Sequence, residues 1–287
     1  MFGPNTYFTD SVDIHFSHRD EEFFNIFQKV TDLFTEKFQL YDYDVLFIPG
    51  SGTIGIESTF FSMDYKLKFI GNDGAFKDRL VALYSNYAHL HNKGANKAEM
   101  FVRLETSISK PFYKEGCLMD CISAFPYYPI PQDTKLFVTC LNKQIGSYVG
   151  LSVVCVKRSE WKHCIDETVF SYLNLRRYYS YLLHRQTPHT TPTFIYEHLY
   201  KVLTNFNLDA HVEKINKVSE LICKHVPDEF IIGDRYCPVI TIKKEAFSDR
   251  IAQQYDLYGY WTGKPVYQFF TYAQPYQDYV DFFNSIS

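Results

Sequence analysis

The sequence predicts an α/β domain built on a mostly parallel sheet, followed by a smaller α+β unit. The first observation is a repeated order of apolar strand, glycine-containing turn and helix, which begins at Val45. The second is that polar residues follow successive apolar runs, at the strand ends where open α/β sheets bind ligands. The third is that helices and strands are grouped rather than alternating beyond Pro192.

Composition bounds the class of protein. A chain of 287 residues has the length of two domains or one large one, and 46% hydrophobic residues suffice for a full core. A net charge of −4 gives no basic field that would recruit nucleic acid or an anionic membrane. No apolar run approaches a membrane span, and Met1–Asp10 lacks the pattern of a signal peptide. We therefore expect a soluble, cytoplasmic protein.

The seven cysteines are scattered, and no second Cys/His pair accompanies Cys117 and Cys121 at zinc spacing. We expect reduced, mostly buried thiols and no metal site. Aromatic residues make up 18% of the chain, with 24 Tyr and 26 Phe. That excess is compatible with a sticky interface, an apolar substrate or a drift in composition.

The predicted large domain covers residues 20–190. Acidic residues after Ser17 mark a helix start, and apolar spacing carries that helix to about Phe38. A second helix follows the glycine turn at residues 50–53. The other elements predicted here are strands at 45–48, 68–70, 100–104, 117–119, 135–140 and 151–156, and a helix at 76–84.

The predicted small α+β domain combines residues 1–19 with residues 191–287, and the linker candidate is 187–192. Its expected helices are 193–203, 212–223 and 276–286, and its expected strands are 238–242 and 266–272.

Several weak signals gain meaning from their order along the chain. Gly50-Ser51-Gly52 before a helix is usually only a turn, a lone Asp is usually a cap, and a lone Lys is usually solvated. Here a phosphate loop, an aromatic residue, a Thr, an Asp and a Lys follow successive strands. A pyridoxal phosphate site needs a helix amino terminus for the phosphate, a flat face for the ring, a carboxylate for the pyridine nitrogen and a lysine for the aldehyde.

The chain resembles the class V aminotransferases of pyridoxal-phosphate fold type I from about Ser11 to its end. It is most similar to phosphoserine aminotransferase, with similarity to 2-aminoethylphosphonate and alanine–glyoxylate transaminases. The matching segments are Ser-His-Arg at 17–19, Leu-Asn-Lys-Gln-Ile-Gly at 141–146, Thr-Thr-Pro-Thr-Phe at 190–194 and Glu-Lys-Ile-Asn at 213–216.

The resemblance implies a role for each matching residue. Lys143 would hold pyridoxal 5′-phosphate as a Schiff base and move the proton, and Asp120 would pair with the pyridine nitrogen. Phe76 would stack on the ring, and Thr106 would bond the phenolic oxygen. The remaining residues implied on the cofactor side are Ser51, Gly52 and Thr53 for the phosphate, and Asn142 beside the lysine.

The resemblance also implies a homodimer with a shared active site. His189 and Thr190 would reach the phosphate bound by the neighbouring subunit. His18 and Arg19 would meet the acidic group of the substrate across the same interface. For His18, a role as a helix-start residue without a ligand has equal weight.

Two departures put the substrate in doubt. The strand expected to carry the arginine that grips the substrate α-carboxylate has no arginine in Val266–Phe270, and the last arginine of the chain is Arg250. Thr53 stands where phosphoserine aminotransferase has an arginine that also serves the substrate phosphate. Either the acceptor lacks an ordinary α-carboxylate, or another anchor such as Arg19, Arg176 or Arg177 holds it.

A third departure concerns length. Only residues 107–116 separate the Glu-Thr-Ser strand from the Asp120 strand, which is too short for a crossover helix. We predict that a loop replaces this helix and that aromatic residues or a partner chain cover the exposed sheet face.

The resemblance therefore predicts an aminotransferase that moves an amino group from an amino donor to a 2-oxo acid or aldehyde. A lyase or decarboxylase acting on an unusual amino substrate is the first alternative, supported by the missing arginine. The second is a non-catalytic binding protein that keeps the fold, although Lys143, Asp120 and Thr106 are all present.

Overall fold

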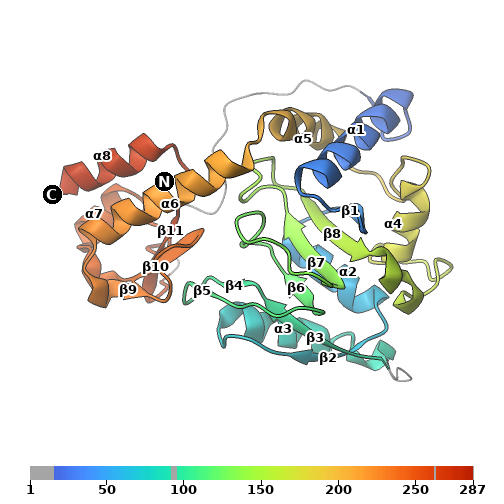
Figure 1. The fold of residues 1–287 in the computed structure, drawn as a ribbon, viewed down its shortest axis with the longest axis horizontal. Helices are drawn as coiled ribbons and strands as arrows, with labels where there is room; N and C mark the ends of the chain where they lie inside the picture. Colours follow the sequence, from blue (N-terminus) through green and yellow to red (C-terminus); the bar gives the residue numbers. More distant parts are fainter. Residues whose placement is uncertain (1–15, 92–95, 262, 287) are drawn as a thin grey trace.

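The computed structural model describes residues 16–91, 96–261 and 263–286. Figure 1 shows one part built around a six-stranded sheet and a second part built around a three-stranded sheet, with helix α6 (Leu208–His225) leading from the first to the second. Residues 1–15, which belong to the predicted small domain, lie outside the described residues.

The large sheet is mostly parallel, as predicted. Its strand order is β1-β8-β7-β6-β3-β2. Strands β2, β3, β6 and β7 pair in parallel, and β8 is antiparallel to both β7 and β1. The bounds are β1 Tyr43–Pro49, β2 Lys66–Phe69, β3 Lys97–Val102, β6 Leu118–Asp120, β7 Leu136–Cys140 and β8 Leu151–Lys157.

Helices cover both faces of this sheet, because most of its strands are buried on both sides. One core holds apolar side chains of α2 (Gly52–Ser62), α3 (Ala75–Ser85) and α4 (Leu175–Leu182). The opposite core holds those of α1 (Glu21–Lys37) and α5 (Thr193–Asn205) and continues into the small sheet. Helix α4, which carries Arg176 and Arg177, was not predicted from the sequence.

The aromatic excess fills these cores. On α1, Phe23, Phe27 and Phe34 recur at helical spacing and are buried. Phe23 and Phe27 pack against the ring of Tyr196 with centroid distances of 5.1 and 5.6 Å, and Phe47 contacts the same ring. Since these rings join α1, β1 and α5, the aromatic residues build the side of the sheet opposite α2 and α3.

A hairpin replaces the crossover helix, which confirms the prediction from the chain length. Strands β4 (Leu104–Glu105) and β5 (Lys110–Pro111) pair antiparallel between β3 and β6, and no helix lies between them. Phe112, just past β5, packs on Phe101 of β3 with a centroid distance of 5.0 Å. An aromatic side chain therefore covers part of the sheet face, which was one of the two predicted solutions.

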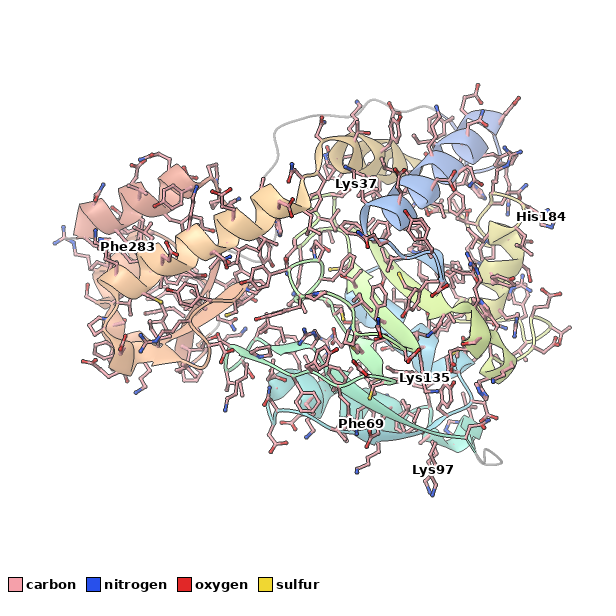
Figure 2. All side chains as sticks on the ribbon, in the orientation of Figure 1. Lys37, Phe69, Lys97, Lys135, His184 and Phe283 are labelled. Carbon is pink, nitrogen blue, oxygen red and sulfur yellow. The ribbon has the colours of Figure 1, made fainter. Side chains whose placement is uncertain are left out.

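Edge strand β2 carries charge on its exposed side. Lys66 and Lys68 alternate with less exposed residues, and Lys68 pairs with Glu99 of β3 at 3.7 Å. Figure 2 shows Lys97, at the start of β3, projecting from the same edge. Lysines on an edge strand discourage pairing with another chain's strand.

The small sheet is antiparallel, with the order β11-β10-β9. Helices α6 and α8 pack on each other beside it, and the label in Figure 2 places Phe283 on α8 in this part. The bounds are β9 Ile231–Ile232, β10 Val239–Lys243, β11 Val266–Phe270, α7 Asp249–Gln254 and α8 Tyr276–Ile286. Short 3₁₀ turns cover Ala88–His91, Arg158–His163, Asp228–Phe230 and Lys244–Ala246.

The division into domains at residue 190 stays a prediction. In the structure α5 packs against α1, beside the large sheet, and α6 then leads to the small sheet.

The tip of the β4–β5 hairpin is tied to the small sheet by buried hydrogen bonds. The hydroxyl of Ser109 donates to the carbonyl of Val239 and accepts from the N–H of Thr241, both at 2.7 Å. The carbonyl of Thr106 accepts from the Thr241 hydroxyl at 2.8 Å and from the Gln268 amide at 2.5 Å. These bonds set the hairpin, and hence the ends of β3 and β6, against the small sheet.

Replacing Ser109 with Ala should lower the free energy of unfolding by about 2–4 kcal/mol, because two buried backbone groups lose their partner. Chemical denaturation measures this effect. Ser85→Ala is the matched control, since its hydroxyl makes only an exposed local bond to Ala82, and it should cost less than about 0.5 kcal/mol. Equal midpoints for Ser109→Ala and the wild type would contradict the role of this contact.

Candidate active site

A pocket of about 210 Å³ opens where the carboxyl ends of β6 and β7 meet the amino end of α2. Open α/β sheets bind ligands at this edge. Seven of the residues singled out from the sequence line it together, namely Ser51, Gly52, Thr53, Phe76, Asp120, Asn142 and Lys143. Its other lining residues are Ile56, Arg79, Leu80, Leu83, Val102, Leu104, Ile122, Ser123, Cys140 and Val149.

The amino end of α2 faces the pocket because of two glycines. Gly50 has a φ of +132°, which lets the chain turn sharply out of β1, and its N–H donates to the carbonyl of Gly150 at 2.8 Å. A Cβ at Gly52 would lie 2.6 Å from Cδ1 of Ile122. The first-turn N–H groups of a helix have no acceptor within the helix, so this end suits an anion.

Lys143 comes from the loop after β7 and points into the pocket. Its ammonium group donates to the hydroxyl of Ser123 at 2.7 Å. Burial, with smaller contributions from the positive charges of Lys264 and Arg79, lowers the pKa of Lys143, and the negative charge of Asp120 opposes this shift. A lysine with a lowered pKa is more often the neutral amine that attacks a carbonyl carbon.

Asp120 ends β6 and is only 7% exposed. Its carboxylate accepts from the N–H of Ile122 at 2.9 Å. Burial raises the pKa of Asp120 to about 6, although the Ile122 N–H and the charge of Lys143 act in the opposite direction. The surrounding groups thus do not make up for the hydration that the carboxylate loses on burial. A positively charged group placed against it would favour its ionised form.

Phe76 is positioned by a carboxylate from another strand. Glu105 of β4 is fully buried, and its oxygens accept from the N–H groups of Phe76 and Lys77 at the amino end of α3. A carboxylate at this end also interacts favourably with the helix dipole. A Cβ at Gly74 would lie 2.4 Å from the Glu105 carboxyl carbon, so glycine leaves room for this contact.

Sequence reasoning missed two polar residues of the pocket. Arg79 donates from Nη2 to the hydroxyl of Thr53 at 2.7 Å, and Ser123 accepts from Lys143. Arg79 lies three residues after Phe76 on one helix, so helical spacing could have identified it. Ser123 follows Asp120 in a non-helical segment, where spacing carries no comparable signal.

Thr106 does not line the pocket in this structure. It follows β4 and is buried, and its carbonyl is bonded to Thr241 and Gln268 of the small sheet. Gln268 belongs to the strand in which the sequence lacks the expected arginine. The predicted role of Thr106 toward a cofactor oxygen therefore stays a prediction.

The four residues expected to act across a dimer interface do not line the pocket, and they come from two segments joined to each other. Arg19 donates to the side chain of Gln186 at 2.7 Å, and the hydroxyl of Thr193 donates to the carbonyl of Phe16 at 3.1 Å. These bonds place His18 and Arg19 beside the segment that carries His189 and Thr190. The dimer roles of these four residues stay predictions.

The two histidines of this group differ in surroundings. The His189 ring stacks on Tyr172 with a centroid distance of 4.1 Å, and its Nε2 is buried without a hydrogen-bond partner among the described residues. Burial and the nearby charge of Arg177 lower the pKa of His189. Partial burial and the adjacent Arg19 lower the pKa of His18. Both imidazoles are therefore mostly neutral near pH 7.

Comparison with solved structures places this fold among the aminotransferases. An aspartate aminotransferase of subgroup IV from Thermus thermophilus aligns with a TM-score of 0.77 and 14% identity over 96% of this chain and 92% of that one. A phosphoserine aminotransferase from Cytophaga hutchinsonii aligns with a TM-score of 0.72 and 16% identity, over 94% of this chain and 90% of that one. An alanine–glyoxylate aminotransferase from Nostoc sp. aligns with a TM-score of 0.71 and 18% identity, over 84% of this chain and 78% of that one.

These likenesses confirm the predicted fold, an α/β fold with a mostly parallel sheet that these solved aminotransferases share. No family model matches the chain, and no curated protein matches it in sequence. Within the part of the chain that the structure describes, no helix has both the length and the apolarity to cross a membrane.

Asp120→Asn tests the buried carboxylate in the ligand-free protein. Because the folded-state pKa of Asp120 lies above its usual value, ionisation of the carboxyl destabilises the fold above about pH 6 and stops doing so as the pH falls toward about 4. The free energy of unfolding of the variant should therefore be about 2–3 kcal/mol higher than that of the wild type near pH 8. Near pH 4 the two values should be nearly equal.

Denaturant titrations at the two pH values measure this difference. The control is Asp73→Asn, an exposed carboxylate whose pKa the Lys77 ammonium lowers, and it should give no stabilisation near pH 8. A pH-independent effect of Asp120→Asn would show that its ionisation is not coupled to folding.

Proposed function

We propose that this protein is a pyridoxal-phosphate-dependent aminotransferase, which moves an amino group from an amino donor to a 2-oxo acid or aldehyde. One observation carries the proposal: Lys143, Asp120 and Phe76 line one pocket with Ser51, Gly52 and Thr53 at the amino end of α2. The fold supports it, because the similar solved structures are described as aminotransferases.

The residues present fit pyridoxal phosphate by their chemistry. Asp120 is a buried carboxylate with too little positive charge around it, which suits a protonated pyridine nitrogen. Lys143 is a buried amine with a lowered pKa, which suits an aldehyde. Ser51, Gly52 and Thr53 at the start of α2 suit a phosphate, and Phe76 offers a flat apolar face.

Pyridoxal phosphate, when bound, supplies an electron sink for the electrons released at the substrate Cα. The chain contributes positioning and proton transfer. Lys143 would move the proton at Cα, and its bond to Ser123 orients the amine toward the pocket. Asp120 would keep the ring nitrogen protonated, and the buried side chain of Leu104 gives the pocket an apolar lining.

We propose a substrate that is not gripped by an arginine of the small sheet. Gln268 lies in the strand where that arginine is expected, and its amide is bonded to the carbonyl of Thr106. The charge-assisted bidentate contact that arginine makes with a carboxylate is therefore lost at this position. This favours an acceptor without an ordinary α-carboxylate, or one held by an arginine elsewhere.

A cytoplasmic homodimer completes the proposal. His18, Arg19, His189 and Thr190 lie together on one side of the chain but not in its own pocket, so they could serve the pocket of a second copy. Analytical ultracentrifugation of the loaded protein would measure the oligomeric state.

Absorption spectroscopy tests the function. Wild-type protein incubated with pyridoxal phosphate and then desalted should keep the visible absorption of the lysine-bound cofactor, and Lys143→Ala should not keep it. Lys97→Ala is the matched control, because this lysine is exposed at the amino end of β3 and does not line the pocket, and it should retain the band.

Amino donors then test the reaction class. One donor in a panel of amino acids and simple amines should convert the visible band to the pyridoxamine form in the wild type. Retention of the band with every donor would argue against transamination. Absence of any visible band in the wild type would contradict the proposed enzyme and favour the non-catalytic binding protein.

A further inference from the structure

Arg79 occupies a position that the proposed function has not used. It comes from α3, and its Nη2 donates to the hydroxyl of Thr53 in the first turn of α2 at 2.7 Å. The resemblance to phosphoserine aminotransferase places an arginine at residue 53 itself, and this chain has threonine there. A guanidinium group therefore reaches the same end of α2 from a different helix.

The charge of Arg79 is available to a ligand. Among the described residues, no carboxylate lies within ion-pair distance of its guanidinium, whereas Lys77 on the same helix pairs with Asp73 at 2.8 Å. The Arg79 side chain is exposed and lines the pocket. Its positive charge also contributes to the electrostatic environment of both Asp120 and Lys143.

Helix α3 holds this side chain in place before any ligand binds. Phe76 and Arg79 are three residues apart, so they lie on the same side of the helix, and both line the pocket. Glu105 fixes the amino end of α3 through two N–H groups, and Thr53 holds one nitrogen of the guanidinium. Arginine has five N–H donors in a planar fork, which leaves donors for an anion at the start of α2.

We propose that Arg79 binds the phosphate of pyridoxal phosphate together with the first-turn N–H groups of α2. This inference rests on the proposed function and extends it by one residue that neither the sequence motifs nor the resemblance identified. The guanidinium supplies the positive charge that residue 53 does not provide, and a phosphate is a dianion that binds arginine through two parallel hydrogen bonds.

A comparison of pyridoxal phosphate with pyridoxal, which lacks the phosphate, tests the proposal. In Arg79→Met, the Kd for pyridoxal phosphate should rise about ten- to hundredfold, because charge-assisted hydrogen bonds are lost. The Kd for pyridoxal should stay within about twofold of the wild type, since no phosphate is involved. The Kd of Arg79→Lys for pyridoxal phosphate should lie between those of Arg79→Met and the wild type.

Two further measurements sharpen the result. Inorganic phosphate should compete with pyridoxal phosphate for the wild-type protein and compete less for Arg79→Met. Lys77→Met, which removes one positive charge from the same helix outside the pocket, should leave both Kd values unchanged.

Each alternative has its own outcome. If Arg79 only ties α3 to α2, Arg79→Met weakens pyridoxal and pyridoxal phosphate by the same factor, and the proposal is wrong. If Arg79→Met binds both compounds like the wild type, the proposal is also wrong while the proposed function stands. If the wild type binds neither compound, the proposed function fails and this inference fails with it.

Discussion

The close approach of helix α2 to the large sheet is the constraint on which the rest of the site depends. A Cβ at Gly55 would lie 2.2 Å from the hydroxyl of Ser152 and 2.7 Å from Val138, so glycine alone permits this contact. The approach brings the amino end of α2 beside the carboxyl ends of β6 and β7. Asp120 ends β6 and Lys143 lies in the loop after β7, and they therefore share one pocket with Gly52 and Thr53.

The electrostatics of the pocket follow from burial. Asp120 has a raised pKa and Lys143 a lowered one, which means that each loses hydration without gaining full compensation from its neighbours. Buried, under-compensated ionisable groups are common where a ligand completes the charge balance. The β4–β5 hairpin lies between β3 and β6, and Ser109 anchors it to the small sheet.

Glu105 shows how the β4–β5 hairpin positions helix α3. Glu105 belongs to β4 of the hairpin between β3 and β6. Its carboxylate accepts hydrogen bonds from the N–H groups at the amino end of α3. Phe76 and Arg79 on α3 are thereby set at the pocket. The small sheet contributes Gln268 to the same hairpin, where its amide donates to the carbonyl of Thr106.

Much of the fold could be predicted from the sequence, because apolar periodicity and glycine turns are local signals that carry from Val45 to Val156. The order of Thr53, Asp120 and Lys143 along successive strands predicted their convergence, since parallel strands end at one edge. Helix α4 was not predicted because it is short and polar on average, and only Leu175 and Tyr178 of its residues are buried. Only the tertiary structure brought Arg79 to Thr53, Ser123 to Lys143 and Gln268 to Thr106, because each pair joins elements whose packing sets the distance and no local pattern encodes it.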